Sequence, residues 1–339
     1  MKTNHYLCTL AFVCASAIGA LAQSNKPVVV TASNTTSNDL LVYDRSGQLL
    51  ATVSTGGAGG VSGNAGGIAS KGRRVAVVNF GSQDVSIFAR YDSGFHLEQL
   101  ISSASNPVSV AFGHGHLYIL GATSVESHQL FDFGVSPGSD GISTLLKADG
   151  SAAQVGVLEK QLIVTEKSNT IETISLSDEG AVTGTPTLVS NIPTNVNVPF
   201  GLVTRDDEAY VTIAHANEIS LVHNDRVITT TGSGTQMAPC WLALDGPWLY
   251  SSNSPSHSVS RYLVYGNEII QKQAVAASFN GAPTDIAYNS GSLAVIDGVG
   301  GISHLSLFHA DADGNLIRQS VSTVAAPING VAVLDVDNE

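Results

Sequence analysis

The chain has few cysteines and few charged residues, and both scarcities restrict what it can be. Cys8 and Cys14 lie within the first 22 residues, so Cys240 is the only cysteine in the remainder. A single cysteine forms no intrachain disulfide, so stability has to come from a hydrophobic core, which 339 residues are enough to bury. Charged residues make up 13% of the chain, which argues against long polar helix faces and is typical of an all-β protein rich in turns.

Long apolar runs are also absent beyond the N-terminus, where none approaches the ~20 residues of a membrane span. The N-terminus itself begins with the cation Lys2, continues with a short apolar stretch at 6–21, and reaches small residues in Ala20-Leu21-Ala22. This pattern predicts a signal peptide at 1–22, cleaved after Ala22. We therefore expect a secreted protein, periplasmic or extracellular, made of residues 23–339.

Positive charge is scarce as well. The formal net charge is −13, or −14 once Lys2 is removed with the signal peptide. Such a surface repels nucleic acids and anionic membranes, so we expect neither as a partner. We further expect a monomer whose partner, if it has one, is a small-molecule lactone or organic acid.

What the chain does have is a repeat. A small or polar residue, often proline, introduces a short apolar strand about every 44 residues; the starts are Gly66, Asn106, Ala152, Val198, Ala238, Ala282 and Ala326. Each start except the last is followed by a turn, a second strand, a polar step, a third alternating strand and a weaker fourth strand. Four antiparallel strands in such a period form one blade of a β-propeller.

The two ends of the chain complete the count. No further strands follow the last start at Ala326, while residues 27–54 contain three strands with no start before them. Joined in one blade, they close an all-β, seven-bladed propeller over 23–339 and remove the exposed sheet edges. A pair of β-sandwiches would not explain one period held along the whole chain.

Several stretches also resemble a known family. They include "LIVTEKSNTIETISL", "APCWLAL" and "APTDIAY", and the most specific part is Val164-Thr165-Glu166-Lys167. Over essentially all of 23–339 the chain resembles the bacterial lactonase-like seven-bladed propellers, which are often labelled 3-carboxymuconate cyclases or 6-phosphogluconolactonase relatives. The resemblance implies a site at the top of the central channel.

One departure from that family bears on the substrate. The sugar-lactonase relatives typically carry arginine, followed by histidine or glycine, directly after the proline that starts a blade. This chain has Val108, Phe200, Cys240, Thr284 and Ile328 at that place. The missing cations argue against a phosphorylated or multiply carboxylated substrate.

Propeller geometry ranks the polar residues. The second strand of each blade returns to the top of the channel, so the residues that follow it should form a ring near the axis. The predicted ring contains Asn79, Glu166, Lys167, His215, Asn253 and Asp297, and the starts of inner strands add Gln154, Asp285 and Asn329 at a similar level.

This ring could perform acid–base chemistry on a lactone. Glu166 or Asp297 would activate water, His215 would carry the proton, and Lys167 or the amides would hold the oxyanion. We predict Glu166, His215 and Asp297 as catalytic and the other six residues as substrate-binding. Two alternatives stay open: a ring that only binds, and a purely structural ring, because every propeller places polar turns near its channel mouth.

Two functions of different class follow. The first is the opening or closing of a lactone ring on a small organic or sugar acid, by a hydrolase or cycloisomerase that needs neither a metal nor a cofactor. The second is a non-catalytic exported scaffold that binds a ligand or protein through its top face. A calcium-dependent lactonase ranks last, because the carboxylates of the ring are few and accompanied by Lys167.

Four further signals have a functional and a structural interpretation, and the structural one is favoured each time. We expect a solvated hairpin at His114 and His116 and not metal ligands, and a plain hairpin turn at 311–315 and not a calcium loop. Residues 56–67 should be a flexible blade connection that overhangs the top, not a phosphate-binding loop. Cys240 should be a packing residue and not a nucleophile.

Overall fold

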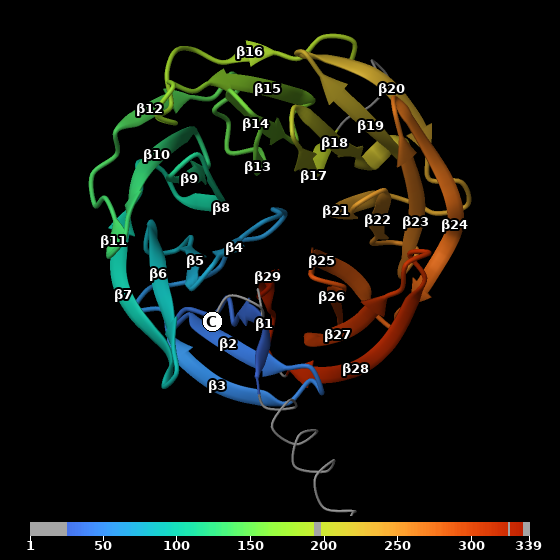
Figure 1. The fold of residues 1–339 in the computed structure, drawn as a ribbon, viewed down its shortest axis with the longest axis horizontal. Helices are drawn as coiled ribbons and strands as arrows, with labels where there is room; N and C mark the ends of the chain where they lie inside the picture. Colours follow the sequence, from blue (N-terminus) through green and yellow to red (C-terminus); the bar gives the residue numbers. More distant parts are fainter. Residues whose placement is uncertain (1–25, 193–197, 325, 335–339) are drawn as a thin grey trace, which may run out of the picture.

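The computed structural model describes residues 26–192, 198–324 and 326–334. It is a closed ring of seven antiparallel sheets around a central axis (Figure 1), as the repeat predicts. The predicted signal peptide at 1–22 lies outside the described residues. In the part of the chain that the structure describes, no helix is long and apolar enough to span a membrane.

The strands run from the axis outward in each blade. Blade 1 contains β29 (Asn329–Val333), β1 (Pro27–Ala32), β2 (Asp39–Asp44) and β3 (Leu49–Ser54). Blade 2 contains β4 (Ile68–Lys71), β5 (Arg74–Asn79), β6 (Asp84–Tyr91) and β7 (Gly94–Ser102). Blade 3 contains β8 (Pro107–Gly113), β9 (His116–Gly121) and β10 (Ser124–Phe131), with an outer strand divided into β11 (Gly134–Val135) and β12 (Gly141–Thr144).

The other four blades follow the same order. Blade 4 contains β13 (Ala152–Val157), β14 (Gln161–Glu166), β15 (Thr170–Ser175) and β16 (Thr187–Leu188). Blade 5 contains β17 (Pro199–Arg205), β18 (Glu208–Ile213), β19 (Glu218–His223) and β20 (Arg226–Gly232), with the 3₁₀ turn η1 (Ala214–Ala216) after β18. Blade 6 contains β21 (Pro239–Asp245), β22 (Trp248–Asn253), β23 (Ser258–Tyr265) and β24 (Glu268–Ser278), and blade 7 contains β25 (Ala282–Asn289), β26 (Ser292–Val299), β27 (Ile302–Ala310) and β28 (Leu316–Val324).

Blade 1 closes the ring with strands from both ends of the chain, which confirms the prediction. The C-terminal strand β29 pairs antiparallel with β1, with Val333 opposite Val29 and Val331 opposite Thr31. The Thr31 hydroxyl also donates to the Gly330 carbonyl at 2.7 Å. Because β29 is innermost in this blade, the closure places a C-terminal residue, Asn329, at the top of the channel.

Local sequence explains why the blades form. The β19–β20 hairpin turns on Asn224 and Asp225, both with positive φ, as a two-residue turn between right-twisted strands requires. The middle strands are buried on both faces between neighbouring blades, and their bulkiest fully buried side chains are Tyr118, Tyr210, Tyr250, Tyr262, Phe88 and Phe308. The core therefore lies between blades, and the inner strands are left to line the axis. We call the end of the ring where the inner strands begin the top, and the opposite end the bottom.

Candidate functional site

A cavity of about 300 Å³ lies on the ring axis, enclosed by the inner strands β4, β8, β13, β17, β21 and β25. Most of its lining side chains are apolar, Val110, Phe112, Val155 and Leu202 among them, but polar atoms make up the larger part of the exposed lining. Among the described residues that line it, Asp285 alone has a titratable side chain. Small-molecule sites combine apolar side chains with a few polar groups, and the volume of this cavity is at the small end of that class.

A β-bulge explains why certain side chains face the axis. Near the start of four inner strands the register shifts after Pro107, Ala152, Pro239 and Pro283, and the next paired residues are Ser109, Gln154, Trp241 and Asp285. A bulge re-aims the side chain that follows it. Three of these four residues line the cavity. The signal in the sequence is therefore the second position after the residue at which the register shifts, which is the first residue of β8, β13 and β21 and the second residue of β25.

Asp285 is the titratable side chain that lines the cavity. Its side chain is 5% exposed, and its Oδ1 accepts the Ile286 backbone N–H at 2.8 Å. Burial raises the pKa of Asp285 to about 7, while hydrogen bonds from the Ile286 and Val331 backbones lower it by less. A carboxyl group with a pKa near neutrality can both accept and donate a proton.

Gln154 supplies a fixed amide on another strand. Its Oε1 accepts the Leu202 N–H of the next blade at 2.7 Å, which sets the orientation of the side chain. The amide nitrogen lies beside Gly66, where an added Cβ would come within 3.3 Å of Nε2. Gln154 therefore presents hydrogen-bond donors at the upper end of the cavity.

Residues 56–67, which we call the roof segment, cover the top of this cavity. In Figure 1 the loop before β4 extends from its own blade toward the axis. The Ala65 N–H donates to the Ala153 carbonyl of blade 4 at 3.1 Å, and the indole N–H of Trp241 in blade 6 donates to the Asn64 carbonyl at 3.0 Å. The Asn64 amide donates to the Val108 carbonyl of blade 3 at 2.6 Å. The segment overhangs the top of the channel, as the sequence predicts, and these hydrogen bonds hold it across the channel mouth.

Gly66 is needed at the lower edge of the roof segment. Its φ is +64°, and an added Cβ would approach the Ser109 hydroxyl to 3.0 Å. Its carbonyl accepts the Val110 N–H at 2.9 Å and the Ser109 hydroxyl at 3.2 Å. Glycine alone combines this conformation with so close an approach.

Two predicted substrate-binding residues contact the roof segment. The Lys167 ammonium donates to the Gly63 carbonyl at 2.5 Å, and burial lowers the pKa of Lys167. Asn329 and Asn64 exchange side-chain hydrogen bonds of 3.0 and 3.3 Å. Asn34 clamps the same segment, with its Oδ1 accepting the Gly60 N–H at 2.7 Å. The side chains of Lys167, Asn329 and Asn34 therefore bond to the roof segment of the same chain.

Glu166, a predicted catalytic residue, contacts the connection between β12 and β13. It is fully buried at the end of β14, and its two oxygens accept the N–H groups of Lys147 and Ala148 at 3.0 and 3.1 Å. Burial raises its pKa. The neighbouring Glu172 accepts the Leu146 N–H at 2.8 Å, and burial raises the pKa of Glu172 to about 7 with a smaller contribution from Glu166. Neither carboxylate is among the residues that line the cavity.

Three other predicted ring residues also lie at the ends of second strands and bond to neighbouring loops or strands. The contacts are Thr55 Oγ1 to Asn79 Oδ1 at 2.8 Å, Asn253 Nδ2 to Ser260 Oγ at 2.8 Å, and Gly281 N to Asp297 Oδ2 at 3.0 Å, with His304 Nδ1 at 3.2 Å from the same Asp297 oxygen. All three side chains are buried. Their common effect is to fasten the start or edge of a blade.

His215, the third predicted catalytic residue, lies in η1 and is exposed. Within the described residues, no hydrogen bond joins His215 to Glu166 or Asp297. The three predicted catalytic residues therefore do not form one bonded group, whereas Gln154 and Asp285 share a cavity.

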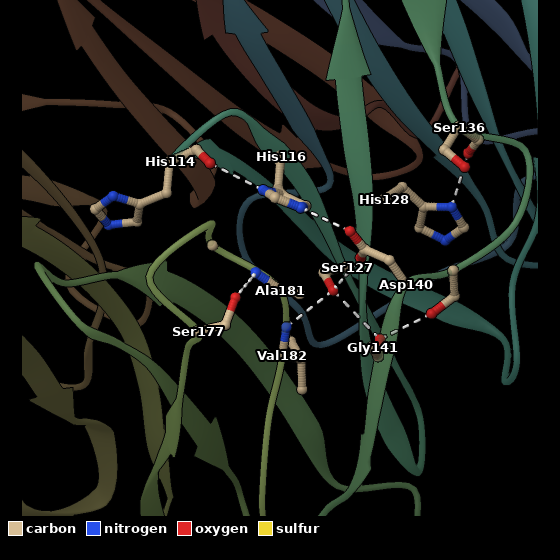
Figure 2. A network of polar contacts seen from close by, with 12 residues as sticks. His114, His116, Ser127, His128, Ser136, Asp140, Gly141, Ser177, Ala181 and Val182 are labelled. Atoms are coloured by element: carbon tan, nitrogen blue, oxygen red, sulfur yellow. Dashed lines mark hydrogen bonds and ion pairs between the residues drawn. The ribbon is translucent and has the colours of Figure 1, made fainter.

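The first of the lesser signals is a buried network (Figure 2), so the expectation of a solvated hairpin was wrong for His116. This imidazole is 2% exposed and lies between the His114 carbonyl and an Asp140 carboxylate oxygen, each at 2.8 Å. Burial raises the pKa of Asp140, but hydrogen bonds from Ser127 and His116 outweigh it and hold that pKa below its usual value. Because the Ser127 hydroxyl donates to Asp140 and not to His116, the network is no nucleophilic triad.

The remaining signals are structural. Asp311 Oδ1 accepts the N–H groups of Asp313 and Asn315, which is the bonding of a hairpin turn. Burial raises the pKa of the Cys240 thiol to about 12, which suits a packing residue and opposes a thiolate nucleophile. In the described parts of the chain, no three His, Cys, Asp or Glu side chains gather to hold a metal ion.

Comparison with known proteins shows likeness in fold. No protein-family profile matches this sequence, and no curated protein sequence does. Among solved structures, a functionally unknown protein from Desulfotomaculum acetoxidans superposes with a TM-score of 0.68 at 11% identity, over 91% of this chain and 99% of that one. The periplasmic gluconolactonase of Pseudomonas aeruginosa gives 0.64 at 13% identity, over 89% and 99%. A candidate 6-phosphogluconolactonase from Bacteroides uniformis gives 0.63 at 14% identity, over 88% and 100%.

Proposed function

We propose that this protein is an exported lactonase-type propeller that opens a small lactone in its central cavity, with Asp285 as the proton-transfer group. The observation that carries the proposal is a buried carboxyl group that lines a cavity of small-molecule size and is the one titratable side chain among the described residues that line it. The likeness to a periplasmic gluconolactonase supports both the reaction class and the export.

The reaction uses two side chains. The Asp285 carboxylate takes a proton from a water molecule while that water's oxygen attacks the lactone carbonyl carbon. The Gln154 amide N–H stabilises the negative charge that develops on the carbonyl oxygen. The ring C–O bond then breaks, Asp285 returns the proton to the ring oxygen, and the product is a hydroxy acid.

The pKa of Asp285 determines the pH profile. A group with a pKa of about 7 is partly ionised at neutral pH, and the ionised form is the base. Turnover should therefore rise as the pH increases through about 7 and level off above it.

The test compares three variants on a panel of lactones. Asp285→Asn removes the base and should lower kcat by at least about 100-fold. Asp44→Asn is a matched control, because Asp44 is also a buried carboxylate but bonds only within its own turn, to Ser46 and Gln48. Glu166→Gln tests the prediction from the sequence. A large loss with Glu166→Gln and none with Asp285→Asn would overturn the assignment of Asp285.

A non-catalytic scaffold is the second candidate. It is favoured by the bonding of Lys167, Asn329 and Glu166 to the chain's own segments, which leaves the predicted ring without free polar groups at those three positions. This role predicts ligand binding without turnover of any lactone in the panel.

A further inference from the structure

We propose that the cavity takes an uncharged lactone and excludes phosphorylated or carboxylated ones, and that this ligand enters from the bottom of the ring. The inference rests on the proposed function, because it names the substrate class of the same site. It joins two independent observations, the chemistry of the cavity wall and the position of the roof segment.

The wall of the cavity excludes anions. No Lys, Arg or His is among the described residues that line it, while Val155, Leu202 and Ile286 offer hydrocarbon. A phosphate or carboxylate moved there from water would lose hydration and meet no counter-charge. Asp285, when ionised, would repel it further. The predicted cation Lys167 bonds to the Gly63 carbonyl of the roof segment and is not among the lining residues.

Because the roof segment is bonded across the top of the cavity, we infer that a ligand enters from the bottom. Hydrogen bonds from blades 3, 4 and 6 hold Asn64 and Ala65 across the top. The lining residues extend in the other direction to Phe112, Val157 and Thr204, which lie at or next to the last residues of their inner strands. The cavity therefore continues toward the turns that join the inner strands to the second strands.

The polarity of the cavity also favours release of the product. Hydrolysis converts an uncharged lactone into a carboxylate, which a wall without cations beside Asp285 binds less well than the substrate. The preference for an uncharged substrate is therefore consistent with turnover, because the product becomes negatively charged only after the lactone ring opens.

The test of ligand class measures kcat/KM for three δ-lactones: one with a pentyl substituent, glucono-δ-lactone, and its 6-phosphate. Binding is measured separately by calorimetry with the lactam analogue of the pentyl compound, which does not need turnover. We expect the alkyl lactone to exceed the phosphorylated lactone by at least 100-fold. Val155→Lys, which adds a cation to the wall, should narrow that ratio at least tenfold.

The test of access uses two bulky substitutions. Thr204→Trp narrows the lower cavity and should reduce kcat/KM and lactam affinity at least tenfold. Ser62→Trp is its matched control, because Ser62 is exposed on the roof segment and is not among the lining residues. The thermal midpoint of each variant distinguishes a block from a failure to fold, and Thr204→Phe provides a smaller block if Thr204→Trp does not fold.

The outcomes separate the inference from the proposed function. Faster turnover of the phosphorylated lactone overturns the ligand class and leaves the lactonase intact. Lactam binding without turnover of any lactone rejects the lactonase and supports the ligand class. A block by Ser62→Trp with none by the Thr204 variants overturns access from the bottom. Neither binding nor turnover of any compound overturns both.

Discussion

Two regions of the ring bury carboxyl groups with pKa values of about 7, and they use them differently. Asp285 faces the central cavity, whereas Glu172 and its neighbour Glu166 face the connection that leads into blade 4. Burial is severe in both regions, so burial alone does not identify a site. Carboxylates in both regions accept backbone N–H groups, but Asp285 also lines the cavity, whereas neither Glu166 nor Glu172 is among the lining residues.

This comparison extends to other blades. The last residue of a second strand fastens a neighbouring segment at Asn79 and Glu166, and Asp297 near the end of β26 bonds to the connection before blade 7. The residue that follows the inner-strand bulge faces the axis at Gln154 and Asp285. Gln154 pairs with Thr165, next to Glu166, and Asp285 pairs with Ile296, next to Asp297. The two positions are therefore adjacent in the antiparallel register, yet one bonds to the chain and the other borders space for a ligand.

The largest expected effect is a loss of activity when Asp285 is replaced, which separates its role from that of Glu166 and Glu172. Asp285→Asn should lower kcat about 100- to 10,000-fold, because the neutral amide accepts no proton from water. The same change should not lower the thermal midpoint, since it removes a buried group whose charged form is disfavoured. Steady-state kinetics and a melting curve on the same preparation check both halves, and a lower midpoint with full activity would contradict them.

The second-largest expected effect is a loss of stability when Glu166 is replaced, which separates its role from that of Asp285. Glu166→Ala leaves the N–H groups of Lys147 and Ala148 without their acceptors. Since each of the two buried N–H groups that loses its acceptor costs about 1–3 kcal/mol, the free energy of unfolding should fall by about 2–6 kcal/mol. Chemical denaturation measures this loss, and Asp44→Ala is a control for removing another buried carboxylate. No loss for Glu166→Ala would mean that the connection does not depend on it.

The third effect is a pH dependence of stability, to which Asp285 and Glu172 should contribute in the same direction. Because the folded pKa values of Asp285 and Glu172 are raised, from 3.8 and 4.5 to about 7, the folded chain binds more protons than the unfolded chain between those values. The free energy of unfolding should therefore fall as the pH rises from about 4 to 7, by up to about 1.4 kcal/mol per pH unit for each group. Denaturation at pH 5, 6, 7 and 8 tests this slope, which Asp285→Asn and Glu172→Gln should each flatten.

A fourth, smaller effect concerns the network of Figure 2. His116→Ala removes a donor to Asp140, whose carboxylate is partly exposed and keeps its bond from Ser127. The expected loss is about 1–2 kcal/mol in the free energy of unfolding. His116→Gln, which can still donate, should recover part of it, and equal losses for the two variants would argue for packing over hydrogen bonding.

The smallest expected effect is that of a substitution at His215, which should change neither stability nor activity. His215 is exposed, so His215→Ala should change the free energy of unfolding by less than about 0.5 kcal/mol. Under the assignment of Asp285 as the base, kcat should change little as well. A loss of kcat as large as that of Asp285→Asn would return the site to the ring that the sequence predicts.

Sequence reasoning succeeded where the information is local. Strand alternation, turn residues and the spacing of Pro199, Pro239 and Pro283 predict seven blades, because hairpin formation depends on neighbouring residues. The unpaired start at Ala326 predicts the shared blade for the same reason. Asp285 and Gln154 were also named as binding residues, but nothing in the sequence distinguished them from Asn79 or Asn253.

The direction of a side chain at the end of a strand depends on the segment that covers it. Glu166 stands at its predicted place on β14, but Lys147 and Ala148, contributed by the preceding connection, decide where its carboxylate is bonded. His116 was misjudged for the same reason, since Asp140 reaches it from 24 residues further along the chain. Neither partner follows from strand periodicity.

The sequence by itself determined the seven-bladed ring and the blade that closes it, because a repeated pattern of strands and turns specifies each hairpin from within. Only the tertiary structure decided where space for a ligand remains. Asn64 meets Asn329 across 265 positions of sequence, and that contact helps to seal the top of the channel. Because such long-range hydrogen bonds depend on how all the blades assemble, they determine which buried carboxylate faces a cavity and which one holds the chain together.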